Sequence, residues 1–252
     1  MKKEWVLVEK VIEEVDIVLE VCDARMPEIT RNKKVENLVF KKRKKLILVF
    51  NKADLISQVF LKELMKKFEK NSVFVSCRKR HGFARLRNLI NKIKGSRKEI
   101  RIGVVGYPNT GKSSLINSLV GKKKALTSPI AGFTKGVQWI KGSGGFLFYD
   151  TPGVIPIDER DEVRKAVIGA VSPQNIKNLD IVAEKIIELF LPYKKSLIEK
   201  LYGINVVDEN PREILELIGK KKNYFLKGGV VDVNRTSVKI INDWQKGKLV
   251  LE

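Results

Sequence analysis

The amino-acid sequence predicts an α/β protein with a mostly parallel sheet, followed by a smaller all-helical region. Short apolar runs rich in Val, Ile and Leu recur through the first 150 residues and alternate with segments whose apolar residues have helical spacing. Such alternation indicates an open sheet with helices on both faces, because parallel strands are buried on both sides and are joined by crossover helices. After about residue 160 the apolar runs give way to helical patterns.

The elements can be placed in order along the chain. The first helix is predicted over 4–14 and the first strand over 15–22. Further strands are predicted at 45–50, 73–75, 100–105 and 146–149, with helices at 59–70, 83–94 and 112–120. The last third is predicted to hold helices at 161–170, 180–190, 193–202, 210–222 and 233–247. We therefore expect two domains, 1–160 and 161–252.

Composition excludes several classes of protein. No run approaches the roughly 18 apolar residues of a membrane span, and the charged start does not resemble a secretory signal, so we expect a cytoplasmic monomer without stable membrane insertion. Two cysteines, Cys22 and Cys77, and one histidine, His81, are too few for a Cys/His zinc site. The formal net charge of +21 points to a polyanionic partner such as nucleic acid or an anionic membrane.

The strongest motif lies at residues 106–113, which read GYPNTGKS. It follows a predicted strand, enters a predicted helix and matches the phosphate loop G-x-x-x-x-G-K-[ST]. Backbone N–H groups of such a loop surround the phosphates of a nucleotide, and the helix N-terminus favours negative charge. Lys112 is expected to reach the β- and γ-phosphates, and Ser113 to bind Mg²⁺. The predicted phosphate contacts are Asn109, Thr110, Gly111, Lys112, Ser113 and Ser114.

A second motif, Asn51-Lys52-Ala53-Asp54, follows the predicted strand 45–50. A carboxylate at Asp54 can accept hydrogen bonds from the N1–H and N2–H₂ groups of guanine, whereas adenine offers no such pair of donors. Asn51 would hold the loop, and the Lys52 stem would lie along the base. Alone, such a tetrapeptide also suits a helix N-cap, but beside a phosphate loop it indicates GTP and GDP. Ser76, Cys77 and Arg78 end the next strand, where GTPases place a Ser-Ala-Lys-like loop; Cys77 and Arg78 depart from that pattern.

The residues expected to sense the γ-phosphate follow the strand 146–149 in Asp150-Thr151-Pro152-Gly153. Asp150 would support Mg²⁺, and the Gly153 N–H would contact the γ-phosphate. Thr134 is the candidate switch residue whose hydroxyl completes Mg²⁺ coordination. The sequence thus assigns catalysis to Lys112, Thr134 and Gly153, and Mg²⁺ to Ser113, Thr134 and Asp150.

The order of these motifs is unusual, because ordinary GTPases have the phosphate loop first and the base motifs last. Here the base motifs precede the phosphate loop, and Asp23-Ala24-Arg25 follows the first strand. In these features the chain resembles the circularly permuted GTPases of ribosome assembly, namely the bacterial large-subunit assembly GTPases and their archaeal and eukaryotic relatives. The role of Asp23-Ala24-Arg25 does not follow from the sequence; an ion pair at the strand end is one interpretation.

The resemblance implies a GTPase with slow intrinsic turnover that is stimulated by the ribosomal particle. Val154 stands where Ras-like enzymes carry the glutamine that orients water. The resemblance suggests a K⁺ ion that supplies the missing charge, with Asn109 as a ligand, although Asn109 also suits an ordinary loop position.

The positive charge lies mainly in the first domain. Residues 1–160 hold 34 Lys and Arg against 16 Asp and Glu, whereas 161–252 hold 16 against 13. One basic run is more often a solvated face than an RNA site, but several together favour salt-sensitive contacts to rRNA. We expect a ribosomal subunit or its precursor as partner, without DNA, with the helical domain adding RNA or ribosome contacts. The large subunit is favoured by resemblance. The alternative is a guanine-nucleotide switch that acts on a protein or membrane partner.

Overall fold

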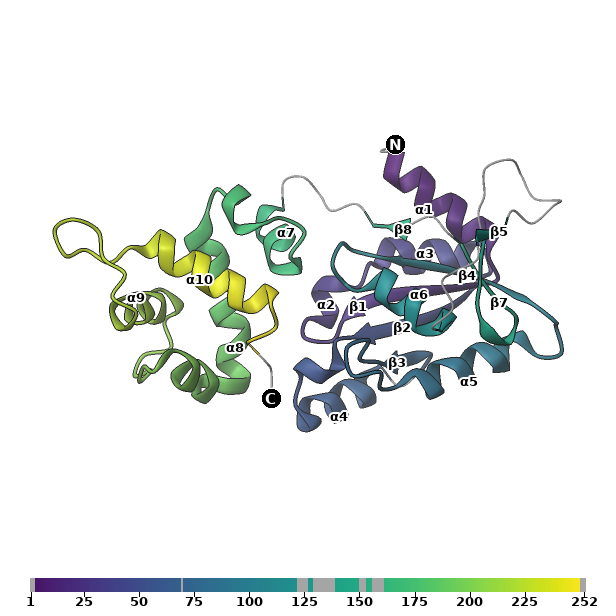
Figure 1. The fold of residues 1–252 in the computed structure, drawn as a ribbon, viewed down its shortest axis with the longest axis horizontal. Helices are drawn as coiled ribbons and strands as arrows, with labels where there is room; N and C mark the ends of the chain where they lie inside the picture. The colour runs from purple at the N-terminus through teal and green to yellow at the C-terminus, as the bar shows by residue number, and fades with distance from the viewer. Residues whose placement is uncertain are drawn as a thin grey trace. The chain divides into compact units, whose positions relative to one another are not determined.

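The computed structural model describes residues 3–68, 70–121, 127–128, 139–149, 153–155 and 161–249. The chain divides into two compact units (Figure 1). The first comprises Met1–Asp54 and Leu61–Pro156, and the second comprises Leu55–Phe60 and Ile157–Glu252. None of the described helices is long and apolar enough to cross a membrane.

The first unit is built on one sheet whose described strands follow the order β3-β2-β1-β4-β7-β6-β5, with β8 also paired to β4. The strands are β1 (Ile17–Asp23), β2 (Lys45–Asn51), β3 (Ser72–Phe74), β4 (Ile100–Gly106), β5 (Thr127–Ser128), β6 (Trp139–Lys141), β7 (Phe146–Tyr149) and β8 (Gly153–Val154). The pairs from β3 to β7, and the pair β4–β8, are parallel, whereas β6 runs antiparallel to both β5 and β7. The predicted mostly parallel α/β sheet is confirmed.

Helices cover both faces of this sheet (Figure 1). The helices are α1 (Lys3–Glu14), α2 (Pro27–Thr30), α3 (Lys33–Lys41), α4 (Gln58–Lys67), α5 (Phe83–Lys94) and α6 (Lys112–Val120), with short 3₁₀ turns η1 (Ala53–Leu55) and η2 (Ser143–Gly145). On one face, Leu86 of α5 and Leu115 of α6 join a buried apolar cluster with Leu19 of β1. On the other face α1 packs closely on β4. Glycine at position 103 permits this approach, since a Cβ there would lie 2.8 Å from Val11 Cγ1.

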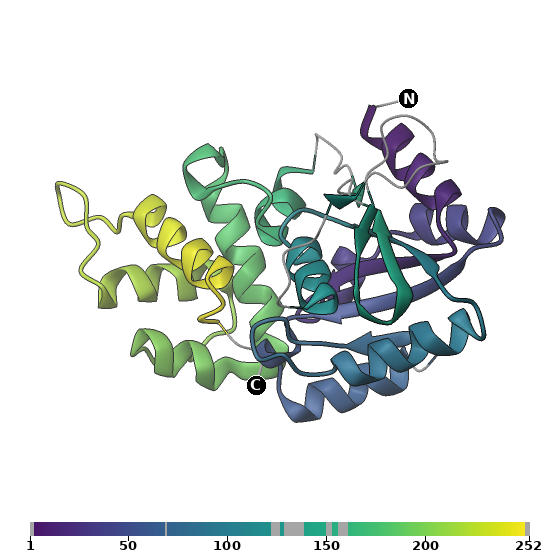
Figure 2. The ribbon, with the colours of Figure 1, turned by 45° about the vertical axis from the view of Figure 1, so that its right-hand side comes forward.

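The second unit is mainly helical (Figure 2). It contains α7 (Glu162–Ile168), the 3₁₀ turn η3 (Pro173–Asn175), α8 (Leu179–Tyr202), α9 (Pro211–Lys221) and α10 (Val233–Gln245). Trp244 is fully buried, donates from Nε1 to the Val167 carbonyl at 2.7 Å, and meets Phe190 edge to face. The prediction of separate helices at 180–190 and 193–202 is wrong, since α8 continues through residue 192. The sequence suggested a break because residue 192 is proline, which lacks a backbone N–H and so removes one helical hydrogen bond. The burial of apolar residues on both sides of it, Phe190 and Ile198, outweighs that loss.

One buried acidic residue lies within β1. Glu20 is fully buried; its Oε1 accepts from the backbone N–H of Asn32 at 2.7 Å, and Oε2 has no hydrogen-bond partner among the described residues. Burial raises the pKa of Glu20 to about 8; the hydrogen bond from Asn32 opposes this, Glu36 adds to it, and Arg31 and Lys33 lower it. Glu20 is therefore protonated in the folded protein at neutral pH.

This shift predicts a pH-dependent stability. Because the folded pKa of about 8 lies above the unfolded value of 4.5, the stabilisation is complete below pH 4.5 and is lost as pH rises through about 8. The free energy of unfolding should fall by up to about 1.4 kcal/mol per pH unit over this window. Glu20→Gln should remove that slope in urea unfolding, whereas Glu63→Gln at an exposed position of α4 should keep it. Equal slopes in the wild type and Glu20→Gln would contradict the protonated state.

Candidate nucleotide-binding site

The phosphate loop connects β4 to α6 along a path that requires glycine at two points. Gly111 adopts φ +99° before the first residue of α6, and a Cβ there would lie 2.1 Å from Asn51 Nδ2. A Cβ at Gly106 would lie 2.6 Å from the Val21 carbonyl oxygen of β1. Both glycines of the motif are therefore needed for close approach to the neighbouring strands.

Lys112 and the start of α6 form a group of donors suited to an anion. The Lys112 ammonium donates to the Tyr107 carbonyl at 2.7 Å, and the Thr110 hydroxyl donates to the same carbonyl at 2.9 Å. Burial lowers the pKa of Lys112 to about 8. The N–H groups of the first turn of a helix have no partner within the helix. A bound phosphate would satisfy these groups and raise the pKa of Lys112 again, because an anion favours the charged ammonium.

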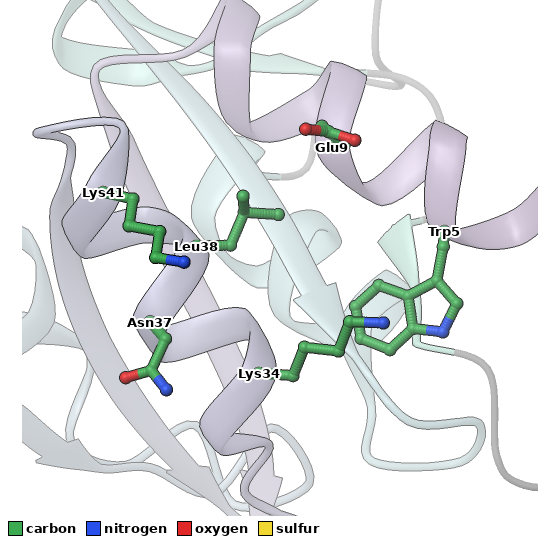
Figure 3. Close-up of a pocket in the computed structure, with 6 residues that line it drawn as sticks. All are labelled: Trp5, Glu9, Lys34, Asn37, Leu38 and Lys41. Carbon is green, nitrogen blue, oxygen red and sulfur yellow. The ribbon is translucent and has the colours of Figure 1, made fainter. Parts of the chain in front are cut away.

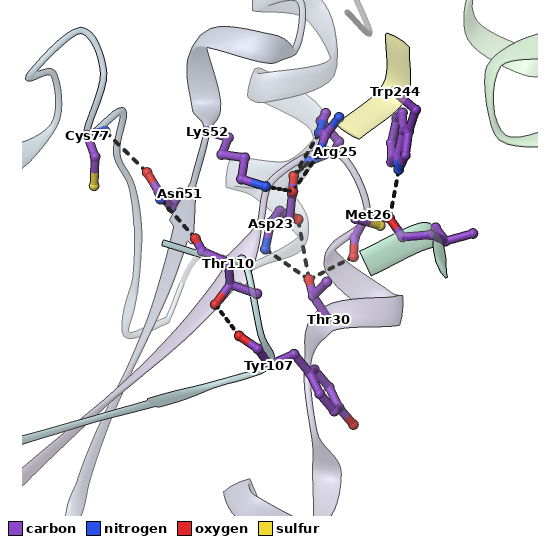
Figure 4. Close-up of polar contacts among 11 residues, drawn as sticks. Asp23, Arg25, Met26, Thr30, Asn51, Lys52, Cys77, Tyr107, Thr110 and Trp244 are labelled. Atoms are coloured by element: carbon purple, nitrogen blue, oxygen red, sulfur yellow. Dashed lines mark hydrogen bonds and ion pairs between the residues drawn. The ribbon is translucent and has the colours of Figure 1, made fainter. Parts of the chain in front are cut away.

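Asn51 connects the phosphate loop to both base motifs (Figure 4). Its Nδ2 donates to the Thr110 carbonyl at 2.9 Å, and its Oδ1 accepts from the Cys77 backbone N–H at 3.2 Å. The Ala53 N–H donates to the Val75 carbonyl at 3.0 Å, which fixes the turn that carries the half-buried Asp54. The structure thus brings together three segments that the sequence assigned to one site.

The loop at 76–78 is held by its own backbone. Ser76 and His81 exchange two N–H to carbonyl bonds of 3.0 and 3.1 Å, and Ser76 Oγ accepts from the Lys79 N–H at 2.9 Å. Burial, the largest influence, raises the pKa of Cys77 to about 11, so its side chain is a thiol at neutral pH. The loop makes these hydrogen bonds although Cys77 and Arg78 depart from the Ser-Ala-Lys pattern.

The ion pair that the sequence offered for Asp23-Ala24-Arg25 is present, and the structure adds a third partner, Lys52, that sequence reasoning missed. The Asp23 carboxylate is fully buried and accepts from Arg25 Nε at 3.1 Å, Arg25 Nη2 at 2.9 Å and Lys52 Nζ at 2.7 Å (Figure 4). Burial alone would raise the pKa of Asp23, but Arg25 and Lys52 outweigh it and lower the pKa to about 2. Asp23 and Asn51 are partners across β1 and β2. Asp23 therefore holds the lysine of the base motif.

The remaining predicted site residues differ in how the structure treats them. Ser113 and Ser114 are exposed in the first turn of α6, and Gly153 is paired with Val105 beside the start of the phosphate loop. Thr134 and Asp150 lie outside the described residues, as do the three consecutive lysines at 122–124, which belong to the basic runs of the first domain.

Ser113 supplies a hydroxyl oxygen of the kind Mg²⁺ accepts. Within the described ranges no group of three or more His, Cys, Asp or Glu residues is placed to hold a metal. This donor set fits Mg²⁺ that takes most of its oxygens from nucleotide phosphates and water.

The sheet, the phosphate loop after β4 and the base motifs after β2 and β3 define a P-loop GTPase fold whose motifs follow a circularly permuted order. Residues 2–159 match the family described as RsgA GTPase, and residues 101–222 match that described as 50S ribosome-binding GTPase. Because the first match spans more than half of the chain, the protein belongs to this family of circularly permuted ribosome-assembly GTPases. The predicted resemblance is confirmed.

Individual relatives agree with this assignment. The chain is 42% identical over 245 residues to an uncharacterized GTP-binding protein of Methanocaldococcus jannaschii, covering 96% of this chain and 65% of the relative. It is 32% identical to nucleolar GTP-binding protein 2 of Pneumocystis carinii, covering 98% of this chain and 53% of the relative. It therefore spans between half and two thirds of these relatives. The crystal structure of GNP-bound YlqF from T. maritima is similar with TM-score 0.65 and 26% identity, covering 99% of this chain and 96% of that one.

The contact between Gly111 and Asn51 predicts a specific loss. Gly111→Ala should displace the Asn51 amide and lower GDP affinity at least tenfold, about 1.4 kcal/mol. A fluorescent GDP analogue titrated against the purified protein measures this affinity. Gly121→Ala is the matched control, because Gly121 ends the same helix at φ +89° with nothing within 4 Å of its Cβ position. Equal losses would assign the effect to backbone strain instead of the Asn51 contact.

Proposed function

We propose that this protein is a GTP-hydrolysing ribosome-biogenesis factor that binds a ribosomal subunit or its precursor in a nucleotide-dependent way. The observation that carries the proposal is the junction at Asn51, which couples a phosphate loop to a guanine motif in the permuted order. The names of the relatives support the biological setting, since they include a nucleolar GTP-binding protein and the 50S ribosome-binding GTPase description. That description and the resemblance favour the large subunit.

We propose that Asp54 accepts the guanine N1–H and N2–H₂ groups, with the Lys52 stem along the base. The ion pair with Asp23 holds Lys52 in place before the base arrives. The loop at 76–78 would complete the base contact through its backbone. Around the phosphates we propose Asn109, Thr110, Gly111, Lys112, Ser113 and Ser114. Mg²⁺ would be bound by Ser113, with Thr134 and Asp150 as its further protein ligands.

Hydrolysis of GTP to GDP and phosphate is proposed to be slow in the free protein. Val154 has no group that orients an attacking water, so positioning rests on Thr134 and the Gly153 N–H. We propose that K⁺, held partly by Asn109, supplies charge at the transition state, and that the ribosomal particle accelerates turnover.

The proposed K⁺ site predicts a cation-dependent rate. Turnover of GTP should be at least fivefold faster in K⁺ than in Na⁺, about 1 kcal/mol of barrier. Asn109→Gly should abolish this difference while GDP still binds, because glycine tolerates the φ of +59° at this position. Asn223→Gly replaces another left-handed asparagine, at φ +55°, and should keep the K⁺ effect. A rate that is the same in both cations would remove Asn109 as a ligand.

We propose that the protein acts as a monomer in the cytoplasm and that its rRNA contacts lie largely within residues 1–160. Residues 1–160 carry 34 basic against 16 acidic side chains, so binding should be dominated by phosphates and weaken with salt. The helical residues 161–252 would add RNA or ribosome contacts.

Co-sedimentation with separated small and large ribosomal subunits tests the function. The protein should pellet with one subunit more tightly with a non-hydrolysable GTP analogue than with GDP. In Asp54→Asn, the amide would pair with xanthine, which has a carbonyl oxygen in place of the 2-amino group. This variant should therefore require the xanthine nucleotide analogue for the same binding. If neither subunit pellets the protein in any nucleotide, the ribosomal role is wrong, and a protein or membrane partner becomes the test.

A further inference from the structure

A groove lies between α1 and α3, on the outside of the helices that cover one face of the sheet. It has a volume of about 480 Å³ and is lined by Trp5, Glu9, Lys34, Asn37, Leu38 and Lys41 (Figure 3). None of these residues belongs to the nucleotide site described above. The volume falls in the range typical of small-molecule sites, roughly 300–1,000 Å³.

Helical spacing explains why these side chains meet. On α3, the residues 34, 37, 38 and 41 fall at i, i+3, i+4 and i+7, so they share one face; on α1, Trp5 and Glu9 are four apart. The Lys34 ammonium lies 4.0 Å from the centroid of the Trp5 ring, and Leu38 lies between the two helices (Figure 3). The groove thus combines an aromatic ring with adjacent lysines.

The balance of charge in the groove is positive. Glu9 is the one acidic side chain of the lining, and Lys42 Nζ lies 3.7 Å from its Oε1. Lys34 and Lys41 are exposed, and Lys41 has no ion-pair partner among the described residues. Phe40, beside Lys41, is 83% exposed. An aromatic ring with cations at its side fits a ligand that carries both a flat base and a phosphate.

We propose that this groove binds an unpaired nucleotide of RNA, with its base against Trp5 and Leu38 and its phosphates at Lys34 and Lys41. The Asn37 amide would hydrogen-bond a base edge or a 2′-hydroxyl. The inference that this nucleotide belongs to RNA rests on the proposed function. Base-paired RNA does not fit, because its bases are stacked within the helix and cannot enter the groove.

Tryptophan fluorescence offers a selective probe of this groove. The chain has three tryptophans, and Trp139 and Trp244 are 1% and 0% exposed, so Trp5 is the one that a ligand can reach. Titration of the full chain with a single-stranded oligouridylate should quench the emission, whereas double-stranded RNA at equal phosphate concentration should not. Anisotropy of a labelled oligouridylate gives the affinity independently.

Three variants separate stacking, local charge and general charge. Trp5→Ala should abolish the quenching and raise the dissociation constant for oligouridylate at least fivefold, the lower end of a base-stacking contribution. Lys34→Gln with Lys41→Gln should weaken binding and reduce the slope of log affinity against log salt by about 1.4, since each phosphate contact to a single strand contributes about 0.7. Lys62→Gln with Lys66→Gln, exposed on α4, removes the same charge away from the groove and should leave the slope unchanged.

The outcomes distinguish this inference from the proposed function. If the wild type pellets with a subunit but oligouridylate neither quenches Trp5 nor binds more weakly to the groove variants, the groove assignment fails and the ribosomal role stands. If oligouridylate binds as predicted while no subunit pellets the protein, the ribosomal role fails and the groove assignment stands. If the α4 control lost as much affinity for oligouridylate as the groove variants, the RNA-binding groove would be overturned. Quenching by polyglutamate without quenching by oligouridylate would also overturn it and would indicate an acidic protein segment as the ligand.

Discussion

The side-chain amide of Asn51 is the point on which the geometry of the nucleotide site depends. Its amino group binds the phosphate loop at Thr110, and its carbonyl oxygen binds the loop at Cys77, so both ends of one amide are used. Each bond contributes only about 0.5–1.5 kcal/mol to the free energy of unfolding. The importance of the two bonds is that they fix the positions of the two loops. There is no room for a Cβ at Gly111 beside this amide, and the two hydrogen bonds of Asn51 connect the phosphate half of the site to the base half. A nucleotide that spans both halves therefore meets a site that is already assembled.

A buried ion-pair network at the end of β1 supports the same motif. Asp23 gathers Arg25 and Lys52 around one buried carboxylate, and the opposite charges hold the pKa of Asp23 at about 2. A buried carboxylate is tolerated only with such partners, so the three residues are interdependent. Asp23-Ala24-Arg25 is thus more than an ion pair at the end of a strand, since it sets the direction of the lysine stem expected to face the base. This contact links the first strand, which carries none of the usual GTPase motifs, to the motif that we propose binds guanine.

Much of the fold and the location of the site were predictable because they depend on local patterns. Buried parallel strands show as continuous apolar runs, and the phosphate loop carries its glycines in the sequence. The elements that escaped prediction were α2, α3, β5, β6 and β8. In α3 the buried Val35 and Val39 are four residues apart, a helical spacing that the sequence does show, so α3 was predictable; β6 owes its place to antiparallel pairing with β7. The burial of Glu20 and the ion pair of Asp23 with Lys52 also depend on distant residues, so no local pattern shows them.

The permuted motif order has a consequence for how the protein is synthesised. Strand β1 lies between β2 and β4, and the chain reaches β4 only after about a hundred residues. As the polypeptide leaves the ribosome, β1 can pair with β2 while its other edge stays open until β4 emerges. Open edges of apolar strands promote association between chains. The nascent chain thus carries the Asn51-Lys52-Ala53-Asp54 motif first and must remain unassociated until β4, which leads into the phosphate loop, covers the open edge of β1.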